Sequence, residues 1–157
     1  MRLLTINTGS SSLKAALYPL ADAEHRDLAV LATRIGQAGG ALTVTDAAGA
    51  TLLDAGRSLP DHAAALVALF AWLRDTRPDL TLVAVGHRIV HGGSRYRAPQ
   101  LVTPALVSAL RDLVPLAHEH PALPQVACFD TAFHRDMPWV ARHYTLPARY
   151  GEAGVLR

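Results

Sequence analysis

The stretch Ile6-Asn7-Thr8-Gly9-Ser10-Ser11-Ser12-Leu13-Lys14 decides how the rest of this sequence is interpreted. Apolar runs precede and follow it, so the pattern predicts two strands joined by a tight turn. Alternation along the second strand would point Ser10, Ser12 and Lys14 to one side and the apolar residues between them into a core. Gly9 permits a positive φ angle and lets the backbone approach a bulky anion closely. The hairpin therefore predicts a phosphate-binding face with two hydroxyls and one ammonium.

Lys14 is the only lysine among the 15 lysine and arginine residues of the chain. A compact ammonium is a frequent phosphate ligand, which favours a binding role for this turn. The alternative is a solvated serine-rich hairpin, because glycine and serine dominate turns. The stretch carries neither a Walker A loop nor a Rossmann fingerprint, so a different phosphate-binding hairpin is indicated.

Composition limits the class of protein. A length of 157 residues predicts one domain, and 50% hydrophobic with 18% charged residues is ordinary for a soluble globular protein. A net charge of +2 without a basic run argues against a nucleic-acid partner. One cysteine, Cys128, excludes an intrachain disulfide and fits a reducing cytosol. There is no signal-peptide pattern, and the longest apolar run, Ala63 to Leu73, is shorter than the ~20 residues of a membrane span. We expect a cytoplasmic protein without a membrane partner.

The remaining patterns predict a mixed sheet with helices. A helix is expected from Asp61 to Arg77, and a second from Thr103 to about Leu113. The apolar face of the first helix is expected to consist of Ala64, Val67, Leu69, Phe70 and Leu73. Further strands are expected at Leu28–Ile35, Ala41–Thr45, Ala50–Asp54, Leu82–Val85 and Gln125–Phe129. Strands first and helix–strand alternation later indicate an α/β fold with a mixed sheet.

Three polar clusters follow strands of this predicted sheet. They run from Asn7 to Lys14, from His87 to Gly93, and from Asp130 to His134. In open α/β sheets the ligand crevice lies outside the ends of such strands. Because all three clusters occupy that position, we expect them to form one site.

The side chains of these clusters suit an anionic substrate. Arg88 could hold a carboxylate or phosphate through two parallel hydrogen bonds, and Val90, two residues on, could contact a small aliphatic tail. Asp130 at a strand tip offers oxygen ligands of the kind that hold Mg²⁺ in kinase sites. The alternatives are a surface ion pair for Arg88 and a cap of the following turn for Asp130.

Two other kinds of site find less support. His87 with His91, or His118 with His120, could suggest zinc, but no cysteine lies near and the first pair sits in a strand-to-loop run. A serine hydrolase would need a Gly-x-Ser-x-Gly elbow between a strand and a helix, and the three serines lie between two strands.

Taken together, the three clusters closely resemble the amino-terminal half of the acetate kinase family. The segments that carry the resemblance are Ile6–Lys14, Val85-Gly-His-Arg-Ile-Val-His-Gly-Gly93 and Gln125-Val-Ala-Cys-Phe-Asp-Thr-Ala-Phe-His134, continued by Met137-Pro138 and Tyr144-Thr-Leu-Pro147. The resemblance implies the ribonuclease-H-like domain of the acetate and sugar kinase, heat-shock chaperone and actin superfamily. It also implies Mg²⁺-dependent transfer of the ATP γ-phosphoryl group to acetate, which gives acetyl phosphate and ADP, and a homodimer for the full-length family.

The resemblance assigns roles residue by residue. It places Asn7 at a position associated with Mg²⁺ and Lys14 at one associated with ATP, with Ser10 and Ser12 in the phosphate-facing hairpin. It implies that Arg88 holds the substrate carboxylate or its developing phosphate, that Val90 lies at the acetate methyl pocket, and that Asp130 is the catalytic aspartate.

The sequence departs from the family in two places. Pro115-Leu-Ala-His-Glu-His-Pro121 stands where the family carries Pro-Leu-His-Asn-Pro, and the stretch from there to Asp130 is shorter, so a helix is expected to be missing. His118 is the candidate for the family histidine. The chain stops at Arg157, so residues 1–157 are expected to form a single amino-terminal domain without the second domain of the family.

Three hypotheses about function remain open. The leading one is an acetate kinase present as a truncated or split chain. A non-catalytic remnant of the amino-terminal domain is the second, motivated by the shortened Leu116–Pro124 region. A propionate or butyrate kinase is the third, because Val90 alone does not fix the size of the substrate pocket.

Overall fold

Antiparallel strands build one half of the sheet, and parallel strands lie at its centre. The computed structural model describes residues 1–22, 24–90, 96, 98–110, 116–117, 120–133, 138, 147 and 149–150. Within them, the strands are β1 (Arg2–Thr8), β2 (Ser12–Pro19), β3 (Leu28–Thr33), β4 (Ala41–Asp46), β5 (Thr51–Gly56), β6 (Leu82–Ile89), β7 (Gln100–Leu101) and β8 (Gln125–Phe129). The helices are α1 (His62–Thr76), α2 (Pro104–Ala109) and α4 (Asp130–Phe133). This arrangement confirms the predicted mixed-sheet α/β class.

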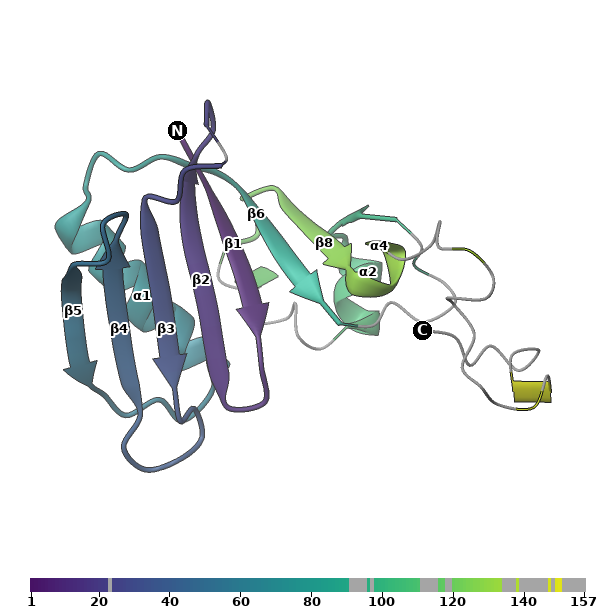
Figure 1. Cartoon of the computed structure of the whole chain (residues 1–157), viewed down its shortest axis with the longest axis horizontal. Helices are drawn as coiled ribbons and strands as arrows, with labels where there is room; N and C mark the ends of the chain where they lie inside the picture. Colours follow the sequence, from purple (N-terminus) through teal and green to yellow (C-terminus); the bar gives the residue numbers. More distant parts are fainter. Residues whose placement is uncertain are drawn as a thin grey trace.

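The central strand β1 sets the direction of the rest of the sheet. The described strands are ordered β5-β4-β3-β2-β1-β6-β8-β7, as Figure 1 shows. Strand β1 pairs antiparallel with β2 and parallel with β6, and β6 pairs parallel with β8. Because β1, β6 and β8 are parallel, their carboxyl ends meet at one edge of the sheet, beside the turn from β1 to β2. Asn7 of β1 and Arg88 of β6 lie just before these ends, and Asp130 directly follows the end of β8.

One face of the sheet is covered by α1. Leu4, Leu13, Leu17 and Val44 are fully buried on that face, where they pack with Leu69 of the helix. The helix begins after Asp61, whose Oδ1 accepts a hydrogen bond of 2.8 Å from the backbone N–H of Ala64. The side chains that α1 buries are Ala65, Leu66, Ala68, Leu69 and Leu73. The predicted apolar face was therefore wrong at Val67, which is exposed.

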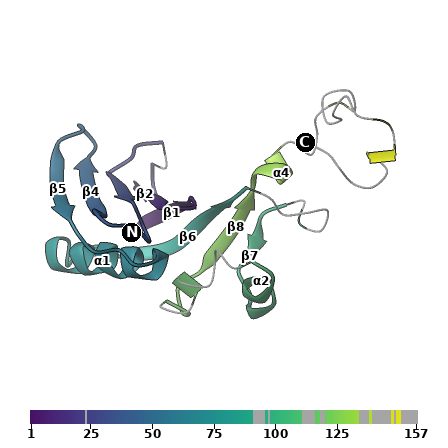
Figure 2. The same cartoon turned by 90° about the horizontal axis from the view of Figure 1, so that it is seen from below.

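The other face of β1 to β5 carries no helix of the described residues. Figure 2 shows α1 and α2 on the same side of the sheet, with the opposite side open above β1 to β5. Residues on the open face alternate with the buried ones, so Thr5, Lys14 and Leu31 are exposed while their neighbours in sequence are buried. This face is available for a ligand.

A second hydrophobic cluster lies beneath β6 and β8. It consists of Ile89, Leu106, Ala127, Phe129 and Ala132, and Tyr96 stacks on Phe129 with ring centroids 5.3 Å apart. It is separate from the larger cluster beneath β1 to β5, which includes Val85 of β6. Strand β6 therefore joins the two packed regions, with Val85 in one and Ile89 in the other.

Several predicted boundaries differ from the structure. Strand β6 continues through His87 to Ile89, because these residues pair with β1 and β8, so Arg88 lies inside a strand and not after it. Strand β3 ends at Thr33, where Arg34 takes a positive φ of 53°. Helix α2 ends at Ala109, earlier than predicted, with Leu110 as its carboxyl cap.

No helix in the described part of the chain is long and apolar enough to cross a membrane.

Candidate functional site

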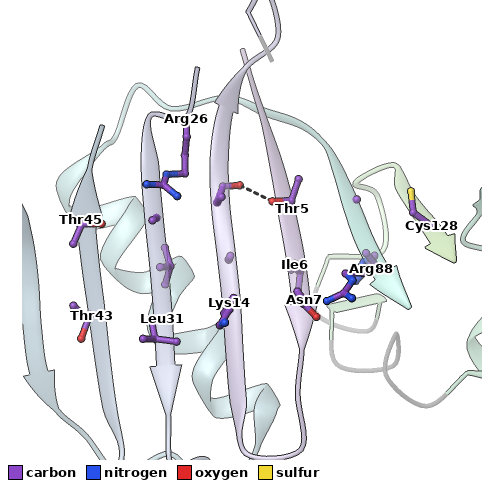
Figure 3. Close-up of a pocket in the computed structure, with 16 residues that line it drawn as sticks. Thr5, Ile6, Asn7, Lys14, Arg26, Leu31, Thr43, Thr45, Arg88 and Cys128 are labelled. Carbon is purple, nitrogen blue, oxygen red and sulfur yellow. Dashed lines mark hydrogen bonds between the residues drawn. The ribbon is translucent and has the colours of Figure 1, made fainter. Parts of the chain in front are cut away.

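Three polar side chains form a row across the open face of the sheet. Asn7 of β1 pairs with Lys14 of β2 on one side and with Arg88 of β6 on the other. Arg88 in turn pairs with Cys128 of β8. Residues paired in register point to the same face, so the four side chains lie side by side, as Figure 3 shows. The structure thus brings together the predicted residues Asn7, Lys14 and Arg88.

The row lies at one end of a depression of about 610 Å³. Small residues such as Ala16, Ala29 and Gly86 line it, and Arg26 and Thr45 lie at the end away from the row (Figure 3). The volume is within the range of small-molecule sites. An anionic ligand in this depression would meet cationic groups near both ends.

Arg88 is held by Asp130 in a two-point ion pair. Arg88 Nε donates to Asp130 Oδ1 at 3.0 Å, and Arg88 Nη2 donates to Asp130 Oδ2 at 2.7 Å. The hydrogen bond and the charge of Asp130 raise the pKa of Arg88 above its ordinary value, so the guanidinium is always protonated. Asp130 uses two of the five guanidinium N–H groups, which leaves one on Nη2 and two on Nη1 for a ligand. The side chain of Arg88 is 54% exposed, so these donors can reach an anion.

Asn7 and Lys14 present polar groups that the described residues do not satisfy. No described residue forms an ion pair with Lys14 or a side-chain hydrogen bond with Asn7. Lys14 is exposed and Asn7 is half-buried beside Arg88. An amide and an ammonium in this state can bind phosphate oxygens.

The turn before Lys14 is closed by its own backbone. The N–H of Gly9 donates to the carbonyl of Ser12 at 2.8 Å. Gly9 does not use the positive φ that glycine permits, since the described residues with positive φ are elsewhere. A Cβ at Gly9 would lie 2.8 Å from Ser12 Oγ, so the hydroxyl of Ser12 would have to rotate away. Ser10 is exposed and Ser12 half-buried, and neither lines the depression, so their phosphate role stays a prediction.

His62 supports the same turn, and no sequence pattern predicted this contact. Its Nε2 lies 2.8 Å from the carbonyl oxygen of Gly9, from which it is 53 residues distant in the chain. His62 is the first residue of α1, so this contact ties the amino end of the helix to the turn. Nothing in the local pattern distinguishes it from an ordinary first-turn histidine.

Val90 lies outside the depression. It follows the last residue of β6, its side chain is 65% exposed, and it does not line the depression beside Arg88. Its expected contact with a substrate methyl group stays a prediction. His91, Gly92, Gly93, His118 and His134 lie outside the described residues.

His87 faces the opposite way from Arg88. It is 3% exposed on the packed face, where its Nε2 lies 2.9 Å from Oε1 of Gln125, itself 4% exposed. Gln125 Nε2 lies 3.4 Å from the carbonyl of Leu116 and 3.2 Å from that of His120, and this orients the amide. Its Oε1 is therefore the acceptor and His87 carries its proton on Nε2. Burial lowers the pKa of His87, although the bond to Gln125 opposes this.

This position argues against a zinc role for His87. The side chain points into the core, and no group of three or more His, Cys, Asp or Glu among the described residues could hold a metal. The oxygen donors beside the row are the amide of Asn7 and the carboxylate of Asp130, whose two oxygens are bonded to Arg88. Oxygen donors of this kind are the ligands that Mg²⁺ prefers.

Comparison with protein families gives one match over nearly the whole chain. The model of the acetokinase family matches residues 2–157. Acetate kinase of Methylocella silvestris is 38% identical over 180 residues, which cover 99% of this chain and 45% of that protein. Acetate kinase of Deinococcus radiodurans is 42% identical over 179 residues, which cover 100% of this chain and 43% of that protein. The chain therefore spans less than half the length of these relatives and corresponds to their amino-terminal half.

Solved structures show the same fold. The crystal structure of Porphyromonas gingivalis acetate kinase superposes with a TM-score of 0.82 and 26% identity, covering 99% of this chain and 44% of that one. A propionate kinase from Francisella tularensis gives a TM-score of 0.79 at 24% identity, covering 97% of this chain and 42% of that one, which supports the fold alone. These neighbours have the ribonuclease-H-like fold of the actin superfamily, which confirms the predicted fold class.

Proposed function

The chain belongs to the acetokinase family, and from this premise we propose that it supplies the acetate-binding wall of an acetate kinase. The reaction would transfer the γ-phosphoryl group of ATP to acetate and give acetyl phosphate and ADP. The observation that carries the proposal is the row of Lys14, Asn7 and Arg88 on one open face, with Arg88 oriented by Asp130.

The chemistry needs positioning more than proton transfer. Acetate is ionised at neutral pH, so no general base has to activate it. The free N–H groups of Arg88 would hold the acetate carboxylate and then the charge that develops on the transferred phosphoryl group. Asp130 would keep the guanidinium in one orientation while this happens. Catalysis on this wall would thus rest on fixed cationic donors.

The other side chains of the row would contact the nucleotide. Lys14 lies two strands from Arg88 and would neutralise phosphate oxygens, with Ser10 and Ser12 in the adjoining turn as further donors. Asn7, between the two cations, would offer an amide oxygen to Mg²⁺. When bound there, Mg²⁺ would supply positive charge that offsets the charge of the phosphate oxygens. Val90, just beyond Arg88, would lie near the methyl group of acetate.

We propose that residues 1–157 form one domain and that turnover needs further groups from the remaining length of the relatives. During transfer, the phosphoryl group must be held between hydrogen-bond donors on both sides of the cleft. Lys14, Asn7 and Arg88 all lie on one face of one sheet, and the relatives are more than twice as long as the matched region. We also propose a cytoplasmic location, where ATP is available and Cys128 would stay reduced.

A chimera tests the proposal. Residues 1–157 would replace the matched amino-terminal half of Deinococcus radiodurans acetate kinase, to which they are 42% identical. Acetyl phosphate formed from ATP, Mg²⁺ and acetate would be trapped as a hydroxamate. We expect turnover by the chimera and none by residues 1–157 alone, and Arg88→Ala should reduce the turnover of the chimera by on the order of 10²- to 10³-fold.

Arg74→Ala is the matched control, because Arg74 is an exposed arginine of α1 that forms an ion pair with Asp75 away from the open face. A folded chimera without turnover, or one in which Arg88→Ala and Arg74→Ala behave alike, would contradict the proposal. Propionate and butyrate in the same assay measure substrate choice. A higher kcat/KM for either would replace acetate as the assigned substrate.

A further inference from the structure

The backbone of the turn between β1 and β2 is held in place at three points. The N–H of Gly9 donates to the carbonyl of Ser12 at 2.8 Å, and the N–H of Ile35 donates to the carbonyl of Ser11 at 2.9 Å. The third point is the carbonyl of Gly9, whose donor among the described residues is the side chain of His62 at 2.8 Å. Of the three contacts, the one made by His62 comes from a side chain.

The contact with Gly9 also determines which atom of His62 carries a proton. A carbonyl oxygen accepts hydrogen bonds and cannot donate them, so Nε2 of His62 is protonated and donates. This is true of the neutral ring with its proton on Nε2 and of the imidazolium ring alike. His62 can therefore donate to the carbonyl of Gly9 in either charge state.

The peptide unit between Gly9 and Ser10 depends on this donor for its orientation. The other two contacts hold different peptide units of the turn, and Gly9 gives the backbone freedom at one end of this one. A peptide unit is planar and trans, so its C=O and N–H groups point in opposite directions. Because the carbonyl of Gly9 points to His62 at the start of α1, the N–H of Ser10 points away from α1.

The N–H of Ser10 is available to a ligand. No described residue accepts a hydrogen bond from it, and Ser10 is exposed. The side chain of Lys14 lies on the face of the sheet that α1 does not cover, so both donors are directed away from the helix (Figure 3). Backbone N–H groups of turns and ammonium groups are both common phosphate ligands.

We propose that His62 is a positioning residue of this turn, which donates to the carbonyl of Gly9 and thereby holds the N–H of Ser10 toward a phosphate group of the nucleotide. His62 itself touches no ligand in this scheme. Its effect on the orientation of the peptide unit follows from the described contacts, whereas its effect on the nucleotide rests on the proposed function.

Two substitutions separate this role from a general effect on α1. Glutamine places an amide N–H near the position of histidine Nε2, whereas asparagine is shorter and reaches only the position of Nδ1. We therefore expect His62→Gln to keep the bond to Gly9 and His62→Asn to lose it. Thr76→Val is the matched control, because Thr76 Oγ1 donates to the carbonyl of Trp72 at 2.7 Å at the other end of α1, about 20 Å away along the helix.

The first measurement follows the backbone ¹H–¹⁵N signal of Ser10 while inorganic pyrophosphate is added to the chain. We expect a saturable shift in the original chain, in His62→Gln and in Thr76→Val, and no shift in His62→Asn. The other amide signals of β1 to β5 should keep their positions in all four proteins.

Three results of this titration would overturn the proposal. One is an equal response of the glutamine and asparagine variants, and another is the absence of any response in the original chain. The third is a lost response in Thr76→Val, or loss of the other sheet signals in His62→Asn, because a general effect on folding would then be sufficient.

The second measurement uses the chimera and separates the two substrates. His62→Asn should raise KM for ATP roughly tenfold relative to His62→Gln, because a hydrogen bond to a charged phosphate loses its alignment. KM for acetate should stay the same, since Arg88 and not Ser10 would hold the carboxylate. If the chimera has no turnover, the proposed function fails while the pyrophosphate titration still decides the role of His62. If KM for ATP is equal in the two variants, the positioning role is rejected even though the function stands.

Discussion

Strands β6 and β8 are joined by two polar contacts that differ in almost every property. On the packed face, His87 and Gln125 are 3% and 4% exposed, and the contact is neutral. On the open face, the side chains of Arg88 and Asp130 are 54% and 34% exposed, and the contact is ionic. His87 and Arg88, which are adjacent in β6, thus make two different contacts. The contact of His87 is buried, and a ligand can reach the contact of Arg88.

The difference shows how a sheet can separate stability from binding. A buried neutral bond has no water to replace it, so its loss leaves unsatisfied groups in the core. An exposed ion pair is screened and contributes little to stability, but its remaining donors are available to an anion. We expect substitutions on the open face to lower activity and leave stability unchanged. Substitutions on the packed face should lower stability.

The largest expected effect is the loss of function in Arg88→Ala. In the chimera, removal of the guanidinium should reduce kcat/KM for acetate by on the order of 10²- to 10³-fold, because a preorganised charge donor is missing in the transition state. The denaturant midpoint should not move. Parallel urea titration and hydroxamate assays check both parts, and a large drop in the midpoint would show that the exposed pair is structural after all.

The next effect is on stability, in Gln125→Leu. This change leaves the His87 donor without its partner, whereas the carbonyl oxygens of Leu116 and His120 each keep a backbone N–H donor. The free energy of unfolding should therefore fall by about 1–3 kcal/mol. Gln100→Leu is the control, since the exposed Gln100 bonds only to the nearby carbonyls of Ala98 and Pro99. It should change stability by less than about 0.5 kcal/mol. Similar losses in both variants, measured by urea unfolding, would argue against a special role for the buried pair.

A smaller effect follows from pH. Burial lowers the pKa of His87 in the folded state below its ordinary value of 6.5. The unfolded chain therefore binds a proton first as the pH falls, so the contribution of His87 to stability is complete above about 6.5 and is lost as the pH falls from there toward the folded pKa. Unfolding titrations between pH 7.5 and 5 should show a shallower decline in His87→Gln than in the original chain. Identical profiles would mean that His87 is not the group responsible.

The smallest effect is expected for Asp130→Asn on folding. An amide keeps one acceptor for Arg88 but removes the charge, so the urea midpoint should stay unchanged at 0.15 M salt. The chimera carrying this change should still bind acetate, with a salt dependence different from that of the original, because the net charge beside Arg88 has changed. A marked loss of stability would erase the contrast between the two faces.

Local patterns predicted the hairpin well. The short turn between β1 and β2 leaves few possible registers, so the pairing of Asn7 with Lys14 follows almost from the sequence. The start of the second predicted helix at Thr103, which caps α2, and the bounds of β8 were also confirmed, since each has a local chemical signature. Short-range chemistry was enough for these features.

Long-range register was not predictable in this way. The pairing of Arg88 with Asp130 depends on how β8 lies on β6, 42 residues away in sequence, and no local pattern states it. Gln125 was interpreted only as the start of an apolar strand. A polar glutamine at the start of a predicted apolar strand did indicate a buried hydrogen bond. Its partners, however, are determined by tertiary packing and not by the local sequence. The same reason explains why the contact between His62 and Gly9 was missed.

The rarity of lysine in this chain has a practical consequence. Lys14 is the single lysine, it is exposed, and it lines the depression beside Asn7. Apart from the α-amino group, an amine-directed fluorophore or cross-linker has one place to react. A spectroscopic reporter can therefore be attached at the candidate site without any change to the sequence, and protection of this amine by ATP would be a direct readout of nucleotide binding.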